Sequence, residues 1–389
     1  MSPRGRLFIA LLSTTLTGYI AVGSLLGRVM GDSTYGQLAV FNEVVRLVLE
    51  AYVEPVNLDR AMAGARLGLT EALDGDSVYL DAEEFRAFQQ PVRESDGDLG
   101  LVLTRRFSFL MVVAARPGSP AEKAGVKPGD IIKTIDGRHS RPLPPAVGYR
   151  LLRGAPGSVV KLTLLRAGSD PVDVTVVRER LANTPPRSKV LEDGSGYLKV
   201  PEMSARVAED VRSELESLKR GGAKRLVLDL RGSGYGVPAE GVKVAELFMK
   251  GGPVARFAAA RATEEVLTAN PARSAWDLPV AVLVDTGTAG ASEIVAAALL
   301  ESGRSPVVGE HTFGRAGVQK TVPLAEGGLV LTVGKYVSPK GNAIHGRGVE
   351  PSVSVEAPDE NEAGDETPKG DPMLDKALEI LKTEAKKAA

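Results

Sequence analysis

The chain has 389 residues, which is long for a single domain, so we expect two or three domains. A formal net charge of -1 provides no basic excess for binding nucleic acid, and the absence of cysteine excludes disulfides, thiolate catalysis and Cys-ligated metals. The three histidines are scattered along the chain, so we expect no metal site, and nothing in the composition implies a cofactor.

The first segment, residues 1–30, contains an uncharged run over residues 7–26 that follows Arg4 and Arg6. About 20 residues without charge are enough to cross a bilayer as a helix. A cleaved signal peptide has a shorter apolar region, about 7–15 residues, and a small-residue cleavage site, which residues 21–23 could supply. A membrane anchor and a cleaved signal peptide both stay open. Because positive charge precedes the run, we expect the rest of the chain in the periplasm or cell exterior.

Residues 31–96 are predicted to form a helical segment. Apolar residues recur at helical spacing over residues 38–52, Pro55 ends that helix, and residues 58–73 indicate a second one. The helical pattern then breaks at residues 73–80, whose sequence is L-D-G-D-S-V-Y-L.

Residues 97–183 contain the ordered motifs of a PDZ domain. The segment 98–101, D-L-G-L, stands where the carboxylate-binding loop is expected, and G-S-P-A, A-G-V, G-D-I-I and I-D-G follow in order. Such a domain adds an extended peptide to a sheet edge, and loop N–H groups hold the terminal carboxylate of that peptide. The predicted peptide-binding residues are Leu99, Gly100, Leu101, Val102 and Leu103.

Glycine is expected at position 100 because a side chain there would block the approach of the carboxylate. The three leucines could line a pocket for an apolar last residue, or at least one of them could be a core residue.

Residues 184–355 alternate strands and helices, which is typical of an α/β domain with a mainly parallel sheet. An apolar strand over residues 226–231 leads into a Gly-rich turn, and another strand covers residues 280–284. The acidic segment 356–372 predicts a flexible linker, and a last amphipathic helix follows at 373–389. The predicted fold class is therefore α+β and multidomain, with an N-terminal helical segment, a β-sandwich or barrel-like PDZ domain and an α/β core.

Two short motifs stand out in the α/β core. Residues 288–293 have the sequence T-A-G-A-S-E, and residues 312–319 have the sequence T-F-G-R-A-G-V-Q. They resemble S-A-S-A-S-E and T-F-G-K-G-x-V-Q, the active-site motifs of the carboxyl-terminal processing (tail-specific) serine peptidases. The turn at residues 73–80 resembles L-D-P-H-S-x-Y-L, which that family places before its PDZ domain. The resemblance covers residues 38–355 and the final helix, and it implies a peptidase-like core.

In this family a Ser hydroxyl attacks the peptide carbonyl and a neutral Lys takes its proton. The nucleophile position of this chain holds Gly290, which has no side chain. The base position holds Arg315, whose guanidinium stays protonated in proteins because its pKa is above about 12. Gln319, the family's partner to the Lys, is retained.

The family's turn D-L-R-x-N-x-G-G supplies an N–H group to the oxyanion hole. Here Tyr235 takes the place of the first Gly of the pair, between Gly234 and Gly236. A side chain there could restrict the backbone or crowd the cleft. Together with the two changes in the dyad, this substitution predicts a catalytically inactive site.

Ser292 is the alternative nucleophile. It lies two positions beyond the family's Ser, and on a helix it would point about 200° away from the cleft. We expect its hydroxyl to cap the helix, with Glu293 favourable in the first turn. Lys320 and Lys335 could be proposed as replacement bases, and His311 as a partner for Ser292.

Three hypotheses follow. The first is an exported, membrane-anchored pseudopeptidase that binds extended C-terminal tails of proteins and regulates or docks an active relative. The second is an active serine endopeptidase that uses Ser292 or a non-standard base. The third is a structural subunit that self-associates through its terminal helices.

Overall fold

The computed structural model describes residues 32–91, 96–141, 143–356 and 370–388. The chain divides into two compact units, residues 1–65 and 66–389, which are described separately. The uncharged run at residues 7–26 lies outside the described residues. In the part of the chain that is described, no helix combines the length and the apolar character needed to cross a membrane.

The first unit contains helix α2 (Asp32–Ala51) and the start of helix α3 (Leu58–Glu71). Both helices lie where the apolar spacing predicts them. Asn57 precedes α3, and its side-chain oxygen accepts a hydrogen bond from the Arg60 N–H at 3.0 Å, which satisfies a free N–H group at the helix start.

In the second unit, the end of α3 leads into the turn at residues 73–80, which ends in strand β1 (Val78–Leu80) and is followed by helix α4 (Ala82–Gln89). Asp74 holds this turn because its carboxylate accepts hydrogen bonds from the N–H groups of Asp76 and Ser77, at 2.9 and 2.6 Å. The turn thus has a fixed shape and presents Asp76 toward the rest of the unit.

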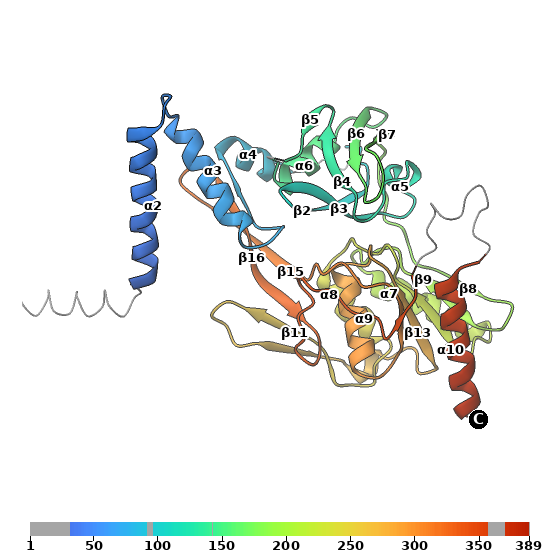
Figure 1. The fold of residues 1–389 in the computed structure, drawn as a ribbon. Coiled ribbons are helices and arrows are strands. Elements are labelled where there is room, and N and C mark those ends of the chain that lie inside the picture. The colour runs from blue at the N-terminus through green and yellow to red at the C-terminus, as the bar shows by residue number, and fades with distance from the viewer. Residues whose placement is uncertain (1–31, 92–95, 142, 357–369, 389) are drawn as a thin grey trace, which may run out of the picture. The chain divides into compact units, whose positions relative to one another are not determined.

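The PDZ domain is built around an antiparallel sheet with the strand order β2-β3-β4-β6-β7, and β5 pairs with β4. Its elements are β2 (Leu101–Arg106), β3 (Phe109–Ala115), α5 (Pro120–Lys123), β4 (Ile131–Ile135), β5 (Arg138–His139), α6 (Pro145–Leu152), β6 (Val159–Leu165) and β7 (Val172–Val177). Strand β2 lies at one end of the sheet, and helix α6 packs against it (Figure 1). This arrangement is the one in which PDZ domains bind peptides.

The core domain is built around a six-stranded sheet with the order β17-β14-β13-β10-β9-β8. Every pairing in it is parallel except that of β8 with β9. Its elements are β8 (Arg187–Val190), β9 (Gly196–Lys199), α7 (Val207–Arg220), β10 (Leu226–Asp229), α8 (Pro238–Glu246), η1 (Pro271–Arg273), β13 (Val280–Val284), α9 (Ala291–Glu301), β14 (Val307–Gly309), β17 (Val353–Ser354) and α10 (Pro372–Ala388). The predicted mainly parallel sheet is confirmed.

Helices cover both faces of this sheet because alternate residues of each strand point to opposite sides. Leu226 and Leu228 of β10 pack in the cluster that contains residues of α7, α8 and α9. Val227, between them, packs in a second cluster with Met373 and Leu381 of α10. Figure 1 shows α8 and α9 next to each other, as their contacts also indicate.

A second, antiparallel sheet has the order β1-β16-β11-β12, with β15 paired to β16. Its further strands are β11 (Pro253–Ala259), β12 (Glu265–Thr268), β15 (Gly317–Pro323) and β16 (Gly328–Val337). Because β1 pairs with β16, this sheet ties the turn at residues 73–80 to the strand that follows the Arg315 motif.

The PDZ domain contacts the core through a small apolar cluster. Val102, Val113 and Ala114 of the PDZ sheet pack with Ala289 of the core, and Phe313 packs against them. Ala289 and Phe313 belong to the two motifs singled out in the sequence. The packing therefore places the PDZ edge strand beside both motifs.

Candidate functional site

One cavity of about 830 Å³ joins the PDZ groove to the two motifs of the core. Its wall includes Gly100, Leu101 and Val102 from the PDZ domain and Gly290, Arg315 and Gln319 from the core. The structure thus brings together the predicted carboxylate loop and the predicted nucleophile and base positions, which lie far apart in the sequence.

Gly290 forms the N-cap of α9, at the sharp turn between β13 and that helix. Its backbone has φ +63° and ψ -118°, a conformation that is strained for any residue with a side chain. Sharp strand-to-helix turns of this kind expose nucleophiles in other hydrolases. A Cβ atom at this position would lie 3.4 Å from its nearest neighbour, the Arg315 carbonyl oxygen. The turn has kept room for a side chain but presents no hydroxyl.

Glu293 connects the two motifs. It is fully buried, and its carboxylate accepts hydrogen bonds from the N–H groups of Gly290, Gly314 and Arg315, at 2.9, 2.7 and 2.7 Å, and from the Thr312 hydroxyl. Burial raises the pKa of Glu293, and these hydrogen bonds oppose the rise. From the spacing of residues, Glu293 is expected only to be favourable in the first helical turn, since its partners in the second motif lie 19 to 22 residues away.

Ser292 is also fully buried, and its hydroxyl donates a hydrogen bond to the Ser233 hydroxyl at 2.7 Å. The prediction that Ser292 caps the helix is wrong, because Gly290 holds the N-cap position and Glu293 binds its N–H group. The Ser292 hydroxyl is directed into the protein, toward the turn that follows β10.

The other groups considered as replacements lie on the surface. Lys320, Lys335 and His311 are exposed, and His311 contacts the carbonyl oxygen of Thr312 through Nδ1. The structure therefore does not bring His311 and Ser292 together as a hydrogen-bonded pair.

Arg315 forms an ion pair with Asp76, with 2.9 Å between Nε and Oδ2. Asp76 is nearly buried and stands where the resembling turn L-D-P-H-S-x-Y-L has a His. Thr104 of β2 donates a hydrogen bond to the other oxygen of Asp76, at 3.1 Å. Burial acts to lower the pKa of Arg315, but the charge of Asp76 and the Tyr149 hydroxyl raise it above its already high ordinary value. The cation at the base position is permanent.

Tyr235 lines the cavity between Gly234 and Gly236, and 46% of its surface is exposed. The guanidinium of Arg116 lies 4.5 Å from the centroid of the Tyr235 ring. Arg116 in turn pairs with the buried Glu202 at 2.7 Å. The ring at the oxyanion position is thus stacked on a fixed cation and occupies space in the cavity.

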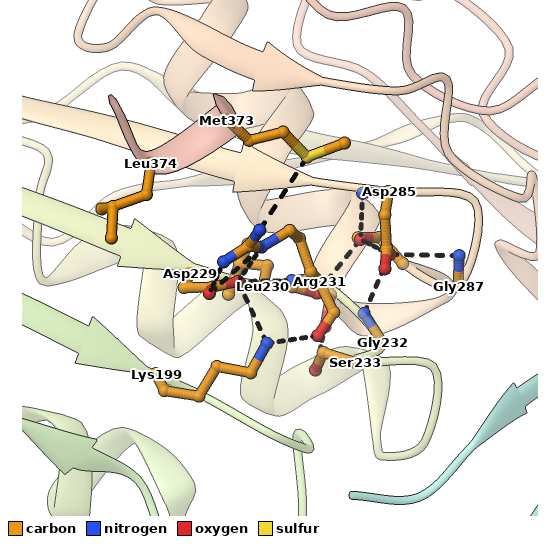
Figure 2. A network of polar contacts seen from close by, with 12 residues as sticks. Lys199, Asp229, Leu230, Arg231, Gly232, Ser233, Asp285, Gly287, Met373 and Leu374 are labelled. Atoms are coloured by element: carbon orange, nitrogen blue, oxygen red, sulfur yellow. Dashed lines mark hydrogen bonds and ion pairs between the residues drawn. The ribbon is translucent and has the colours of Figure 1, made fainter. Parts of the chain in front are cut away.

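A polar network holds the turn that follows β10 and begins at Asp229 (Figure 2). The buried Asp229 accepts hydrogen bonds from Tyr197 at 2.6 Å, from Lys199 at 3.0 Å and from Arg231 at 2.6 Å. Arg231 also pairs with Asp371 at the start of α10, at 2.8 Å. Burial acts to raise the pKa of Asp229, but Arg231 and Lys199 outweigh it and lower this pKa to about 2.

Asp285, which follows β13, also holds the turn after β10 (Figure 2). Its carboxylate accepts hydrogen bonds from the N–H groups of Gly232 and Gly287, at 2.8 and 3.1 Å, and from the Thr288 hydroxyl at 2.9 Å. The turn after β10 and the turn after β13, both of which precede Gly290 in the chain, are therefore held by carboxylates.

The PDZ loop differs from the prediction at two leucines and agrees with it at Gly100. Leu99 and Leu103 are fully buried in the PDZ core, so only Gly100, Leu101 and Val102 of the predicted peptide-binding residues line the cavity. Gly100 has φ +80°, and a Cβ atom there would lie 2.4 Å from the Cβ of Ser119. Glycine is therefore required by local packing as well as by ligand approach.

Known protein families match both the PDZ domain and the core domain. Peptidase family S41 matches residues 194–355, and the PDZ domain family matches residues 111–166. The chain is 32% identical over 360 residues to the carboxy-terminal processing protease CtpA of Bacillus subtilis, covering 91% of this chain and 76% of the relative. It is 31% identical over 336 residues to the carboxy-terminal-processing protease of Bartonella bacilliformis, covering 84% and 77%.

A solved structure shares the fold. The photosystem II D1 C-terminal processing protease aligns with a TM-score of 0.70 and 27% sequence identity, covering 81% of this chain and 86% of that one. The similarity thus extends over the PDZ domain and the core together.

Proposed function

Because this chain belongs to the carboxy-terminal processing protease family, we propose that it binds the C-terminal tails of proteins through its PDZ domain without cleaving them. The observation that carries this proposal is that Arg315, paired with Asp76, lines the same cavity as Gly290, which occupies the nucleophile position. Membership of the family accounts for the fold, while activity depends on the groups at the site.

The absence of activity follows from the chemistry of two residues. The family's mechanism needs a side-chain hydroxyl as nucleophile, and Gly290 has no side chain. A general base must accept a proton, and a guanidinium paired with a carboxylate does not. The nearby Ser292 hydroxyl is buried against Ser233, which argues against the alternative of an active peptidase that uses this residue.

The ability to bind is supported by what remains. The cavity still contains Gly100 and Leu101 of the loop that receives a carboxylate in PDZ domains. Arg116 and Arg153 line the same cavity, where each is paired with a carboxylate, Glu202 and Asp98 respectively. A tail held there without hydrolysis would be protected from, or delivered to, an active relative.

A binding and cleavage assay tests this proposal. We expect the purified protein to leave an unfolded substrate with an apolar tail uncut, and to bind a short fluorescent peptide with the same tail. Amidation of the peptide carboxylate should weaken binding by about tenfold or more, because the charge-assisted hydrogen bonds to the carboxylate are lost. Cleavage that disappears in Ser292→Ala would contradict the proposal and support the active alternative.

We also propose that the protein is exported and held at a membrane by residues 7–26, because that run is long enough to span a bilayer and follows two arginines. Carbonate extraction of membranes should leave the full-length protein in the pellet, and added protease should reach the PDZ domain from outside. Recovery of the protein in the cytoplasmic fraction would overturn this part of the proposal.

A further inference from the structure

We infer that the PDZ groove is closed by the protein's own groups, and that a bound tail must displace Tyr149 from the edge strand and Asp98 from the carboxylate loop. This inference rests on the proposed function, since it concerns how the same groove selects its ligand. Three contacts support this inference, two along β2 and one in the loop before it.

Tyr149 occupies the middle of the strand edge. Its hydroxyl, on helix α6, accepts a hydrogen bond from the Leu103 N–H at 2.7 Å and donates one to the Leu103 carbonyl oxygen at 3.3 Å. β2 is the end strand of its sheet, so these two groups are the ones that an added peptide strand would pair with. The hydroxyl thus takes both backbone positions that a ligand residue would use.

The far end of the same edge is also occupied. The Arg105 N–H, two residues further along β2, donates a hydrogen bond to the Gly75 carbonyl oxygen at 3.1 Å. A Cβ atom at position 75 would overlap the Arg105 carbonyl oxygen, so glycine permits the turn at residues 73–80 to lie against the strand. Only the beginning of β2, at Leu101 and Val102, opens to the cavity.

Asp98 occupies the carboxylate loop. Its carboxylate accepts a hydrogen bond from the Gly100 N–H at 2.8 Å and pairs with Arg153 at 2.8 Å. A ligand carboxylate would compete for the same N–H group, and the fixed charge of Asp98 would repel it. The loop therefore holds an internal carboxylate where the end of a tail would bind.

A second partner is present for the Tyr149 hydroxyl when a peptide displaces it from Leu103. Tyr149 also interacts with Arg315, which is paired with Asp76. Tyr149 and Arg315 both line the cavity, so a Tyr149 hydroxyl that leaves the Leu103 groups still has a cation and solvent in the same cavity.

Peptide affinity in single variants tests this inference. Tyr149→Phe removes both hydrogen bonds to Leu103 and should tighten binding of a free-carboxylate peptide with an apolar tail by about five- to tenfold. Asp98→Ala should tighten binding by a similar factor, because it frees the Gly100 N–H. Asp98→Asn should tighten it less than Asp98→Ala, since the amide oxygen can still accept from Gly100.

Matched controls separate these effects from general changes. Tyr52→Phe removes an exposed tyrosine hydroxyl, and Asp170→Asn removes an exposed charge within the PDZ domain; both should leave affinity unchanged. Amide NMR gives a second measurement on the unmodified protein, in which the Leu103 and Gly100 signals should shift when the peptide is added.

The outcomes are distinct for the two proposals. If wild type and all variants bind the peptide equally, or if the Leu103 signal stays in place on binding, the inference is wrong and the proposed function stands. If no variant binds any C-terminal peptide, both the proposed function and the inference fall. Tighter binding by Tyr149→Phe, with both controls unchanged, supports the closed groove.

Discussion

The double variant Gly290→Ser with Arg315→Lys is expected to remain without peptidase activity, whereas the further changes Asp76→His and Tyr235→Gly are expected to create it. The reason lies in Asp76, which is 2.9 Å from the base side chain and nearly buried. A Lys beside this carboxylate would have its pKa raised and would stay protonated near neutral pH. A Lys at position 315 can act as a base only when the charge of Asp76 is removed. The family's turn L-D-P-H-S-x-Y-L has His where this chain has Asp76.

The nucleophile position tolerates the change. At Gly290 a serine would adopt φ +63°, which costs about 1–3 kcal/mol, but the nearest atom leaves room at 3.4 Å. Tyr235→Gly removes the ring from the oxyanion position and restores the family's pair of glycines. A working base and oxyanion donor each contribute about 10²-fold or more, so the quadruple variant should exceed the double variant by at least that factor.

Cleavage of an unfolded substrate with an apolar tail measures this effect at each step. The matched control is the quadruple variant with Ala instead of Ser at position 290, which should be inactive although its site is otherwise identical. Activity in the double variant alone would show that Asp76 does not hold the base in its charged form. Inactivity of the quadruple variant would show that further parts of the cleft have diverged.

Asp229→Asn is expected to lower the free energy of unfolding by about 3 kcal/mol at neutral pH. Asp229 is buried and accepts hydrogen bonds from Tyr197, Lys199 and Arg231, so an amide in its place removes the charge that pairs with two cations and turns one acceptor oxygen into a donor. The same change should loosen α10, because Arg231 also holds Asp371 at the start of that helix. Denaturant unfolding of the two proteins measures the difference.

The effect should depend on pH in a defined direction. The pKa of Asp229 is lowered from 3.8 to about 2 in the folded protein, so the folded state favours the charged form. The stability that Asp229 contributes, about 2 kcal/mol from this shift, is present above pH 4 and is lost as the pH falls toward 2. Wild type and Asp229→Asn should therefore converge in stability at the acid end of that window.

An exposed aspartate provides the control. Asp277 pairs with Lys219 at 3.5 Å on the surface, and Asp277→Asn should change the free energy of unfolding by less than about 1 kcal/mol. An equal loss in Asp277→Asn and Asp229→Asn would contradict the assignment of Asp229 to a buried network.

Much of the fold could be predicted from the sequence because local patterns determine it. The helices at 32–51 and 58–71 and the alternating strands and helices of the core follow from apolar periodicity and from Gly and Pro. The ordered PDZ motifs predicted the PDZ domain itself. The prediction failed where side-chain direction mattered: Leu99 and Leu103 point into the PDZ core instead of a ligand pocket.

Some features of the candidate site could likewise be predicted from the sequence, and others could not. Position 290 carries no hydroxyl and position 315 carries a permanent cation in any fold, because these are properties of glycine and arginine, so both facts can be read from the sequence. The role of that cation depends on the folded chain, since its partner Asp76 lies 239 residues away in the sequence. The burial of Ser292 against Ser233 and the closure of β2 by Tyr149 likewise depend on packing between distant segments, which no spacing of residues encodes.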